Sequence, residues 1–278
     1  MYNFCVLKNR WPQIRLLPVL CLLCVALTSY AQKLHLTDSV AIDFPTAASI
    51  DKTGNVFISN ARGEVRKYSS LGELLATFTP QQPSAISSIE AWQMLRVFVF
   101  YDKSQQYIFL DRLLNASQPQ LLKDVIHGFA SHATTGEDNS LWLINETSLA
   151  LEKYDLRTGR QLVSTDLTLF LDKDFQFFRL KTYQNKLYIS MGRQGMLVFD
   201  AFGSFIQKLP LDNVTHFNFY NDELYYLNEH YIHFYNLYTF QERFIAFPAK
   251  TEPLYGLVVL DSVMLITERM MYLFRLVP

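Results

Sequence analysis

The histidines are the residues whose type and spacing come closest to a site for metal binding or acid–base catalysis. His230 and His233 lie three positions apart on a predicted strand, so their side chains point to opposite faces and do not share one ion. His127 and His132 flank a loop and the start of a strand, without a carboxylate at ligand spacing. We therefore expect structural histidines and no metal site.

Other motifs of defined chemistry are present only in part. Asp172 and Asp174 form an acidic pair without the further oxygen ligands and the turn glycine of a calcium loop, so we expect a solvated loop there. The segment Asp155-Leu-Arg-Thr158-Gly159 resembles half of a quinoprotein blade signature, but Val163 stands where that family places a tryptophan. The sequence has no serine nucleophile elbow, no two-histidine zinc helix and no phosphate-binding glycine loop. We predict no catalytic residues and no cofactor.

The start of the chain has the pattern of a signal peptide. A leader with three cations and no acid precedes an apolar run over residues 16–27, which is too short to span a bilayer comfortably. Ser29 and Ala31 are small residues at the two positions that a signal peptidase reads. We expect a signal peptide over residues 1–31 and a single domain over residues 32–278. A retained membrane anchor is the alternative.

Composition limits the classes of partner. All three cysteines lie in the leader, so the predicted mature chain has no disulfide, no thiolate metal site and no cysteine nucleophile. The formal net charge of −1 for the whole chain falls to −4 when the three cations of the leader are removed. This balance argues against nucleic acid or an anionic membrane surface as the partner. Later apolar runs have the length of strands, so we expect no transmembrane span in the mature chain.

Internal repetition predicts the fold. Six apolar segments, interpreted as the inner strand of each unit, recur at intervals of 37 to 46 residues, and a further strand ends 11 to 13 residues after each start. Units of about forty residues with several short, aromatic-rich strands are typical of a β-propeller. We predict an all-β fold, a six-bladed β-propeller of four-stranded antiparallel blades. The six segments are Val56–Ile58, Val97–Val99, Leu141–Leu143, Leu187–Ile189, Leu224–Tyr226 and Val263–Leu265.

The two ends of the domain are predicted to complete one blade. The sixth unit ends at Pro278 with chain for only three strands, while an additional amphipathic stretch from Lys33 to Ile42 precedes the first unit. A blade of three strands would leave an unpaired edge. We therefore expect the N-terminal stretch to supply the missing outer strand and to close the ring.

The first unit resembles a known family. The pattern is that of an NHL-type blade, it is similar to secreted six-bladed, TolB-like propellers, and it extends over residues 44–78 before it decays to hydrophobic periodicity. This resemblance implies architecture and says little about activity. The six-bladed lactonases build a metal site from carboxylates and an Asn on inner strands, whereas the inner positions predicted here are apolar (Phe129, Phe177, Phe217 and Val258). The resemblance is carried by Pro45, Ile50-Asp51, Gly54-Asn55-Val56-Phe57-Ile58-Ser59, Lys67-Tyr68 and Gly72.

Two surfaces are candidates for binding. The first is formed by the turns between the second and third strands, where ligands dock in related propellers, although any solvated loop carries similar charges. The second is the stretch 215–247, in which 12 of 33 residues are Phe or Tyr. Packing between blades is the interpretation we prefer for this stretch over a stacking surface. The candidate residues of the turns are Asn60, Arg62, Tyr101, Asp102, Lys103, Asn145, Glu146, Arg193, Glu229, Glu268 and Arg269.

The expected function follows from the missing motifs. We expect a non-enzymatic, monomeric β-propeller that binds a protein or a small ligand on its loop face. The leader predicts export, to the periplasm of a bacterial cell or beyond it. The alternative is a metal-dependent hydrolase or lactonase of the six-bladed type, which requires a carboxylate cluster in the central channel.

Overall fold

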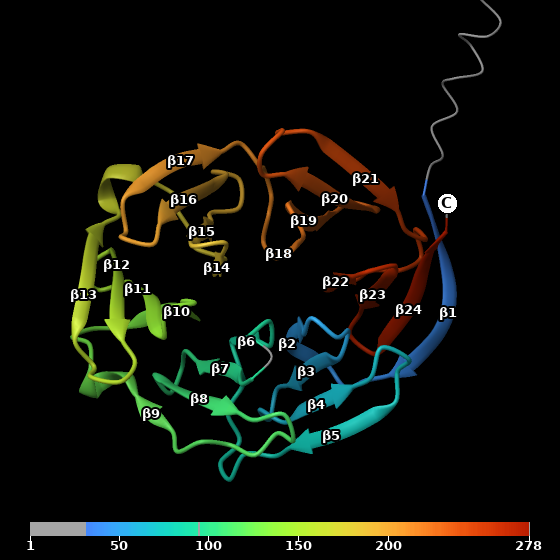
Figure 1. Ribbon diagram of the computed structural model, residues 1–278, viewed down its shortest axis with the longest axis horizontal. Coiled ribbons are helices and arrows are strands. Elements are labelled where there is room, and N and C mark those ends of the chain that lie inside the picture. The colour runs from blue at the N-terminus through green and yellow to red at the C-terminus, as the bar shows by residue number, and fades with distance from the viewer. Residues whose placement is uncertain (1–31, 94, 278) are drawn as a thin grey trace, which may run out of the picture. The chain divides into compact units, whose positions relative to one another are not determined.

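Six small sheets surround a common axis (Figure 1). The computed structural model describes residues 32–93 and 95–277, of which Lys33–Val277 form one compact unit. Each sheet has four antiparallel strands, and the sheets face one another as the blades of a propeller. The predicted all-β, six-bladed β-propeller is confirmed.

In blades one to five the first strand lies nearest the axis and the last lies outermost. Blade one comprises β2 (Pro45–Ile50), β3 (Val56–Asn60), β4 (Val65–Tyr68) and β5 (Leu74–Phe78). Blade two comprises β6 (Ser88–Glu90), β7 (Val97–Tyr101), β8 (Gln106–Leu110) and β9 (Gln120–Leu121). Blade three comprises β10 (Ala130–Thr135), β11 (Ser140–Asn145), β12 (Ala150–Asp155) and β13 (Gln161–Asp166).

The second half of the ring repeats this order. Blade four comprises β14 (Arg179–Tyr183), β15 (Lys186–Ser190), β16 (Met196–Asp200) and β17 (Phe205–Leu209). Blade five comprises β18 (Phe217–Tyr220), β19 (Glu223–Asn228), β20 (Tyr231–Asn236) and β21 (Glu242–Ala246). Blade six comprises β22 (Tyr255–Val259), β23 (Ser262–Ile266) and β24 (Met270–Val277), and it is completed by β1 (Lys33–Ala41).

The apolar repeat lies one strand farther from the axis than we predicted. The six repeating segments belong to β3, β7, β11, β15, β19 and β23, which are second strands. A second strand is paired on both edges and covered on both faces by neighbouring blades, so it requires the most continuous apolar sequence. The inner strands border the axis and have room for polar residues.

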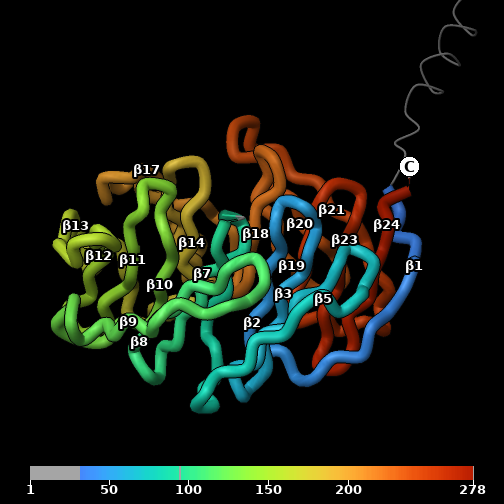
Figure 2. The backbone as a smooth tube through the Cα atoms, turned by 60° about the horizontal axis from the view of Figure 1, so that its bottom comes forward, coloured from blue at the N-terminus to red at the C-terminus, as the bar shows by residue number. Residues whose placement is uncertain are grey.

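The strand β1 closes the ring. It pairs antiparallel with β24, with one register shift between Leu36 and Asp38. Figures 1 and 2 show β1 along the outer edge of blade six, beside the C-terminal strand. This pairing confirms the predicted closure, and it leaves β24 with a partner on each side.

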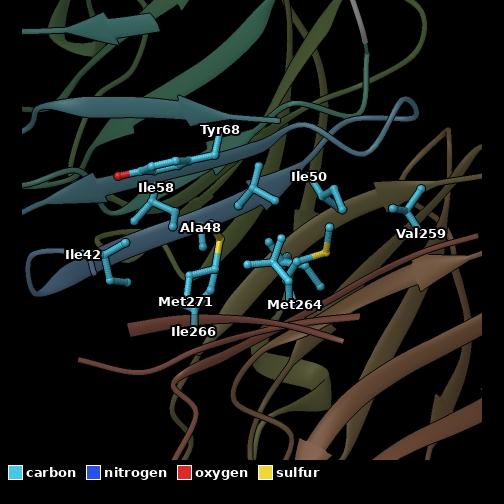
Figure 3. Packing of buried hydrophobic residues seen from close by; sticks show 12 residues of the cluster. Ile42, Ala48, Ile50, Ile58, Tyr68, Val259, Met264, Ile266 and Met271 are labelled. Atoms are coloured by element: carbon cyan, nitrogen blue, oxygen red, sulfur yellow. The ribbon is translucent and has the colours of Figure 1, made fainter. Parts of the chain in front are cut away.

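The hydrophobic core is divided among the interfaces between blades. Each of six clusters of buried side chains combines residues from two adjoining blades. In the cluster between blades six and one, Ile50 and Ile58 pack with Met264 and Met271, and Ile42 joins them at one end (Figure 3). Because Ile42 directly follows β1, ring closure and this core are coupled.

Non-glycine residues in left-handed turns explain why the repeat fades in the sequence. After the third strand, Gly72 (φ 87°) and Leu114 (φ 65°) occupy the same hydrogen-bonded turn position in blades one and two. In blades three and five, Gly159 (φ 68°) and Phe240 (φ 59°) likewise correspond to each other in a hydrogen-bonded turn after the third strand. A side chain at positive φ is strained. The turn geometry is therefore retained although its glycine signal is lost.

Helices are few among the described residues. Two single-turn 3₁₀ helices, η1 (Leu122–Asp124) and η2 (Thr168–Phe170), follow β9 and β13. In the part of the chain that the structure describes, no helix is long and apolar enough to cross a membrane. The predicted signal peptide, residues 1–31, lies outside the described residues, so its cleavage stays a prediction.

Candidate functional site

The two ends of the propeller axis are surrounded by different turns. Pro45 at the start of β2 pairs with Asn60 at the end of β3, and Arg179 at the start of β14 pairs with Ser190 at the end of β15. Each inner strand therefore begins beside the turn between the second and third strands. We call this end of the propeller the rim face, and the end where the inner strands finish the opposite face.

All eleven predicted binding residues lie in or next to the six turns of the rim face. However, Asn60, Tyr101 and Asn145 are buried, so their side chains are not presented on its surface. The Asn145 amide shapes its own turn by accepting a hydrogen bond from the Thr147 N–H at 3.1 Å. Asp102 is half-buried. The exposed members are Arg62, Lys103, Glu146, Arg193, Glu229, Glu268 and Arg269, and ligand binding by them stays a prediction.

The histidines named in the sequence are dispersed. His230 lies in the turn before β20 and His233 lies within β20, where its ring stacks on Tyr226 with the centroids 5.2 Å apart. His127 precedes β10, and His132 lies within it. Among residues 32–93 and 95–277, no group of three His, Cys, Asp or Glu side chains is arranged to hold a metal ion.

The aromatic stretch 215–247 forms blade five and packs mainly between blades. Phe219, Tyr225 and Phe234 are buried in the two clusters on either side of this blade. The ring of Tyr183 from blade four stacks on Phe219 with the centroids 4.2 Å apart. This is the interpretation that we preferred for the stretch.

Polar residues recur at one level of the inner strands. In five blades, a buried polar residue of the inner strand pairs with an aromatic residue of the second strand. The sixth blade has Leu257 opposite Met264 at this level. We call the five polar residues the polar belt. The pairs are Ser49 with Phe57, Glu90 with Phe98, Thr134 with Trp142, Lys181 with Tyr188, and Asn218 with Tyr225.

Hydrogen bonds connect the polar belt from blade to blade. The Thr134 hydroxyl lies 2.9 and 2.8 Å from the two carboxyl oxygens of Glu90. Lys181 donates from Nζ to the Asn218 side-chain oxygen at 2.6 Å. Buried polar groups are tolerated when they have such partners. These partners reduce the cost of placing the belt in the protein interior.

Burial changes the protonation of the two ionisable belt residues. Burial lowers the pKa of Lys181 to about 7, with Arg179 acting in the same direction and Glu90 opposing. Burial raises the pKa of Glu90, against the opposing effects of Lys181 and Thr134. Both shifts follow from the cost of a charge in a poorly solvated site. At neutral pH the belt thus holds an amine that exchanges its proton readily.

A small recess lies between the polar belt and the rim face. Arg179, His216, Tyr225 and Tyr255 line it, and its volume is about 20 Å³. A space of this size admits about one water molecule or one ligand oxygen. Arg179 also has a buried Nε without a hydrogen-bond partner within the described residues. Because Arg179 lines the recess and its guanidinium carries several N–H donors, the recess is suited to receive an acceptor oxygen.

His216 presents an unprotonated imidazole to this recess. Desolvation, followed by the charge of Arg179, lowers the pKa of His216 to about 4, even though the residue as a whole is exposed. The ring packs against Tyr255 with the centroids 4.8 Å apart. The Tyr255 hydroxyl is itself held, because it donates to the Thr46 carbonyl oxygen at 2.7 Å. A neutral imidazole can accept a proton while a guanidinium stabilises a negative oxygen.

His132 is a second imidazole near the rim face. It lies half-buried in β10, directly after the register shift between Ala130 and His132. Burial lowers the pKa of His132, and the Phe178 backbone and Glu146 partly oppose this effect. The Nδ1 of the ring lies 2.9 Å from the Ser131 hydroxyl oxygen. We expected His132 to be a structural histidine, without considering that burial would lower its pKa.

The sequence reasoning missed the recess and the belt because it placed the inner strands incorrectly. Phe129 and Phe177, which we interpreted as inner-strand residues, precede β10 and β14. The sequence does contain a usable signal, the alternation of charged and apolar residues in Arg179-Leu180-Lys181. Alternation of this kind marks a strand with one polar face.

Comparison with known proteins identifies the fold. Neither a protein family nor a curated protein matches the sequence. The chain is similar to virginiamycin B lyase from Staphylococcus aureus, with a TM-score of 0.61 and 9% identity over 86% of this chain and 99% of that one. A streptogramin B lyase matches with a TM-score of 0.60 and 11% identity, over 88% of this chain and 97% of the other. A catalytically inactive histidine-to-alanine variant of the Staphylococcus aureus enzyme with quinupristin has a TM-score of 0.63, with 9% identity over 86% and 99% of the two chains.

These neighbours correct the function that we expected. Each of them is a lyase, so the expectation of a non-enzymatic scaffold is wrong on this comparison, and the enzyme alternative agrees with it better. At this low identity the likeness itself establishes the shared propeller fold.

Proposed function

We propose that the protein is an enzyme and that its site is the recess around Arg179 on the rim face. The observation that carries the proposal is that Arg179 and the neutral ring of His216 line the same recess. The guanidinium stabilises the negative oxygen that develops when a carbonyl compound reacts. The imidazole accepts the proton that is removed. This pair suits cleavage of an ester, either by elimination or by hydrolysis.

The solved structures support an acid–base reaction. The Staphylococcus aureus virginiamycin B lyase becomes inactive when one histidine is replaced by alanine, which agrees with a need for an imidazole. We propose a cyclic peptide ester or a lactone as the substrate class. Only the reacting oxygen enters the recess of about 20 Å³, and the rest of the substrate lies on the exposed turns. Arg62, Arg193 and Arg269 are available there for polar contacts.

The finer assignments rest on sequence patterns. The motif over residues 44–78 supports membership of the NHL or TolB-like propellers. The leader over residues 1–31 supports export to the periplasm or beyond the cell. Closure of the ring by the chain's own β1 supports a monomer, because blade six is completed without a strand from a second copy.

The experiment measures ester cleavage by mass spectrometry. The protein is incubated with quinupristin and with a panel of lactones, where elimination leaves the product mass unchanged and hydrolysis adds one water. The variants Arg179→Met and His216→Gln should each lower kcat/KM by about 100-fold or more. His35→Gln, an exposed histidine on β1, is the matched control and should keep full activity.

Two results would reject this proposal. The first is that the wild-type protein cleaves no ester of the panel. The second is that it cleaves an ester, but both recess variants cleave the same ester with an unchanged kcat/KM. A loss of activity in His132→Gln with full activity in His216→Gln would transfer the role of base to His132 and exclude it for His216.

A further inference from the structure

A larger cavity opens at the opposite face, beyond the polar belt from the Arg179 recess. Its volume is about 390 Å³, which lies in the range of small-molecule sites. It is bounded by the final residues of the inner strands and by the turns that follow them. Belt residues Glu90 and Lys181 belong to its lining, together with Lys52, Trp92, Thr182 and Tyr183.

The inner end of this cavity carries an amine and an acid. Lys181 is 5% exposed and Glu90 is 8% exposed, so both are nearly enclosed by the inner strands. Each residue acts electrostatically on the other. Because burial favours the uncharged amine, Lys181 has a free nitrogen lone pair near neutral pH, unlike a solvated lysine. A desolvated lysine of this kind is the nucleophile that forms imines with carbonyl compounds.

The walls of the cavity indicate the shape of the ligand. The rings of Trp92 and Tyr183 lie with their centroids 6.3 Å apart and tilted by 59°. Lys52 places its ammonium 5.2 Å from the Trp92 centroid, and the Thr182 hydroxyl is already engaged, since it donates to the Thr135 carbonyl at 2.6 Å. The rings of Trp92 and Tyr183 thus provide the apolar contact in a lining that also includes Gln93, Thr135 and Glu137. Two inclined rings accommodate a flat, apolar body.

We propose that this cavity captures a small aromatic aldehyde as an imine on Lys181. The lone pair of Nζ attacks the carbonyl carbon, and the Glu90 carboxyl gives its proton to the oxygen. The hydroxyl of the resulting carbinolamine then leaves as water, with protons supplied by the amine nitrogen and exchanged through Glu90. One aldehyde and one amine give one imine and one water, so the step requires no oxidant or reductant. The site lies on the other face from the Arg179 recess and does not rest on its proposed function.

Reductive trapping tests this proposal. The full-length protein is incubated with benzaldehyde, sodium cyanoborohydride converts any imine to a stable secondary amine, and peptide mapping by mass spectrometry locates the adduct. Lys181 should be labelled at least tenfold more than Lys186, a half-buried lysine on the neighbouring strand β15. Lys181→Arg should lose this label. Lys186→Arg is the matched control and should retain it.

Two further variants separate the site from general lysine reactivity. Trp92→Ala removes part of the aromatic wall without altering the belt, and it should lower labelling of Lys181 by benzaldehyde several-fold. Glu90→Gln should slow labelling because it removes the proton donor. Labelling spread over the exposed lysines with Lys181 unmodified would overturn the proposal. Equal labelling of Lys181 in wild type and Trp92→Ala would overturn the aromatic specificity.

Discussion

Arg179 contributes to the pKa shifts of several side chains around the axis. Its charge contributes to the lowered pKa values of His132, His216 and Lys181, after desolvation in each case. One fixed cation disfavours a second positive charge close to it. Arg179 therefore adds to the desolvation that disfavours the protonated forms of two imidazoles and one amine.

We expect His216 to make stability depend on pH between about 6.5 and 4. Its pKa is about 4 in the fold and near 6.5 in the unfolded chain. In this window the unfolded chain binds more protons, so the free energy of unfolding decreases as the pH falls from 6.5 to 4. Urea denaturation at pH 7 and pH 4.5 measures the decrease, which should be smaller in His216→Gln than in wild type.

Carboxyl groups titrate in the same range, so the matched variant His35→Gln supplies the reference. His35 is exposed on β1 and should leave the wild-type decrease unchanged. Equal decreases in His216→Gln and His35→Gln would contradict the neutral state of His216 in the fold.

At the scale of the element, the closing strand β1 depends on a turn in blade one. Gly72 lies in the turn between β4 and β5 at a φ of 87°, and a Cβ there would lie 2.7 Å from Val40 Cγ2 of β1. Gly159 in blade three has a similar φ of 68°, but its nearest neighbour would be 3.9 Å away. A side chain would thus be strained by the backbone conformation at both positions, but only at Gly72 would its Cβ also overlap a neighbouring strand.

Gly72→Ala should therefore destabilise the protein more than Gly159→Ala. The positive φ costs about 1–2 kcal/mol in both variants. Overlap with β1 adds about 1–3 kcal/mol in Gly72→Ala alone. Chemical denaturation of the two variants measures the difference. Equal free energies of unfolding would mean that β1 moves to accommodate the added methyl group without a cost in stability.

At the scale of the whole molecule, the rim face and the opposite face of the propeller differ in chemistry. The rim face combines a guanidinium and imidazoles over a recess for one oxygen, whereas the opposite face has an aromatic cavity with an amine. The polar belt lies between them and contributes Asn218 to the first and Lys181 to the second. One ring of inner strands thus supports two separate sites.

We also expect the chain to be exported and cleaved after Ala31. The basic leader, the apolar run over residues 16–27 and the small residues before Gln32 are the features that a signal peptidase requires. Mass spectrometry of the protein from its native host should find Gln32 at the N-terminus. Recovery of Met1 on a membrane-bound protein would show a retained anchor instead.

The number of blades and their closure could be read from the sequence, because they depend on local patterns. Short apolar strands such as Val97–Tyr101 recur at a regular spacing, and the stretch from Lys33 to Ile42 had no other place in a six-unit ring. The exposed rim residues, Arg62 and Arg193 among them, were found for the same reason, since turns between such strands are solvated.

Only the tertiary structure decided which residues meet at the axis. Arg179, His216 and Tyr255 come from blade four, from the residue preceding blade five, and from blade six, and nothing in their local sequence links them. Lys181 reads as an ordinary charged residue until the ring buries it beside Asn218. The pattern of apolar residues that marks a strand depends on residues close together in the chain. The desolvation of side chains at the axis, and the charges around them, arise only when the six blades pack around that axis. The fold was therefore predictable from the sequence, and the candidate site was not.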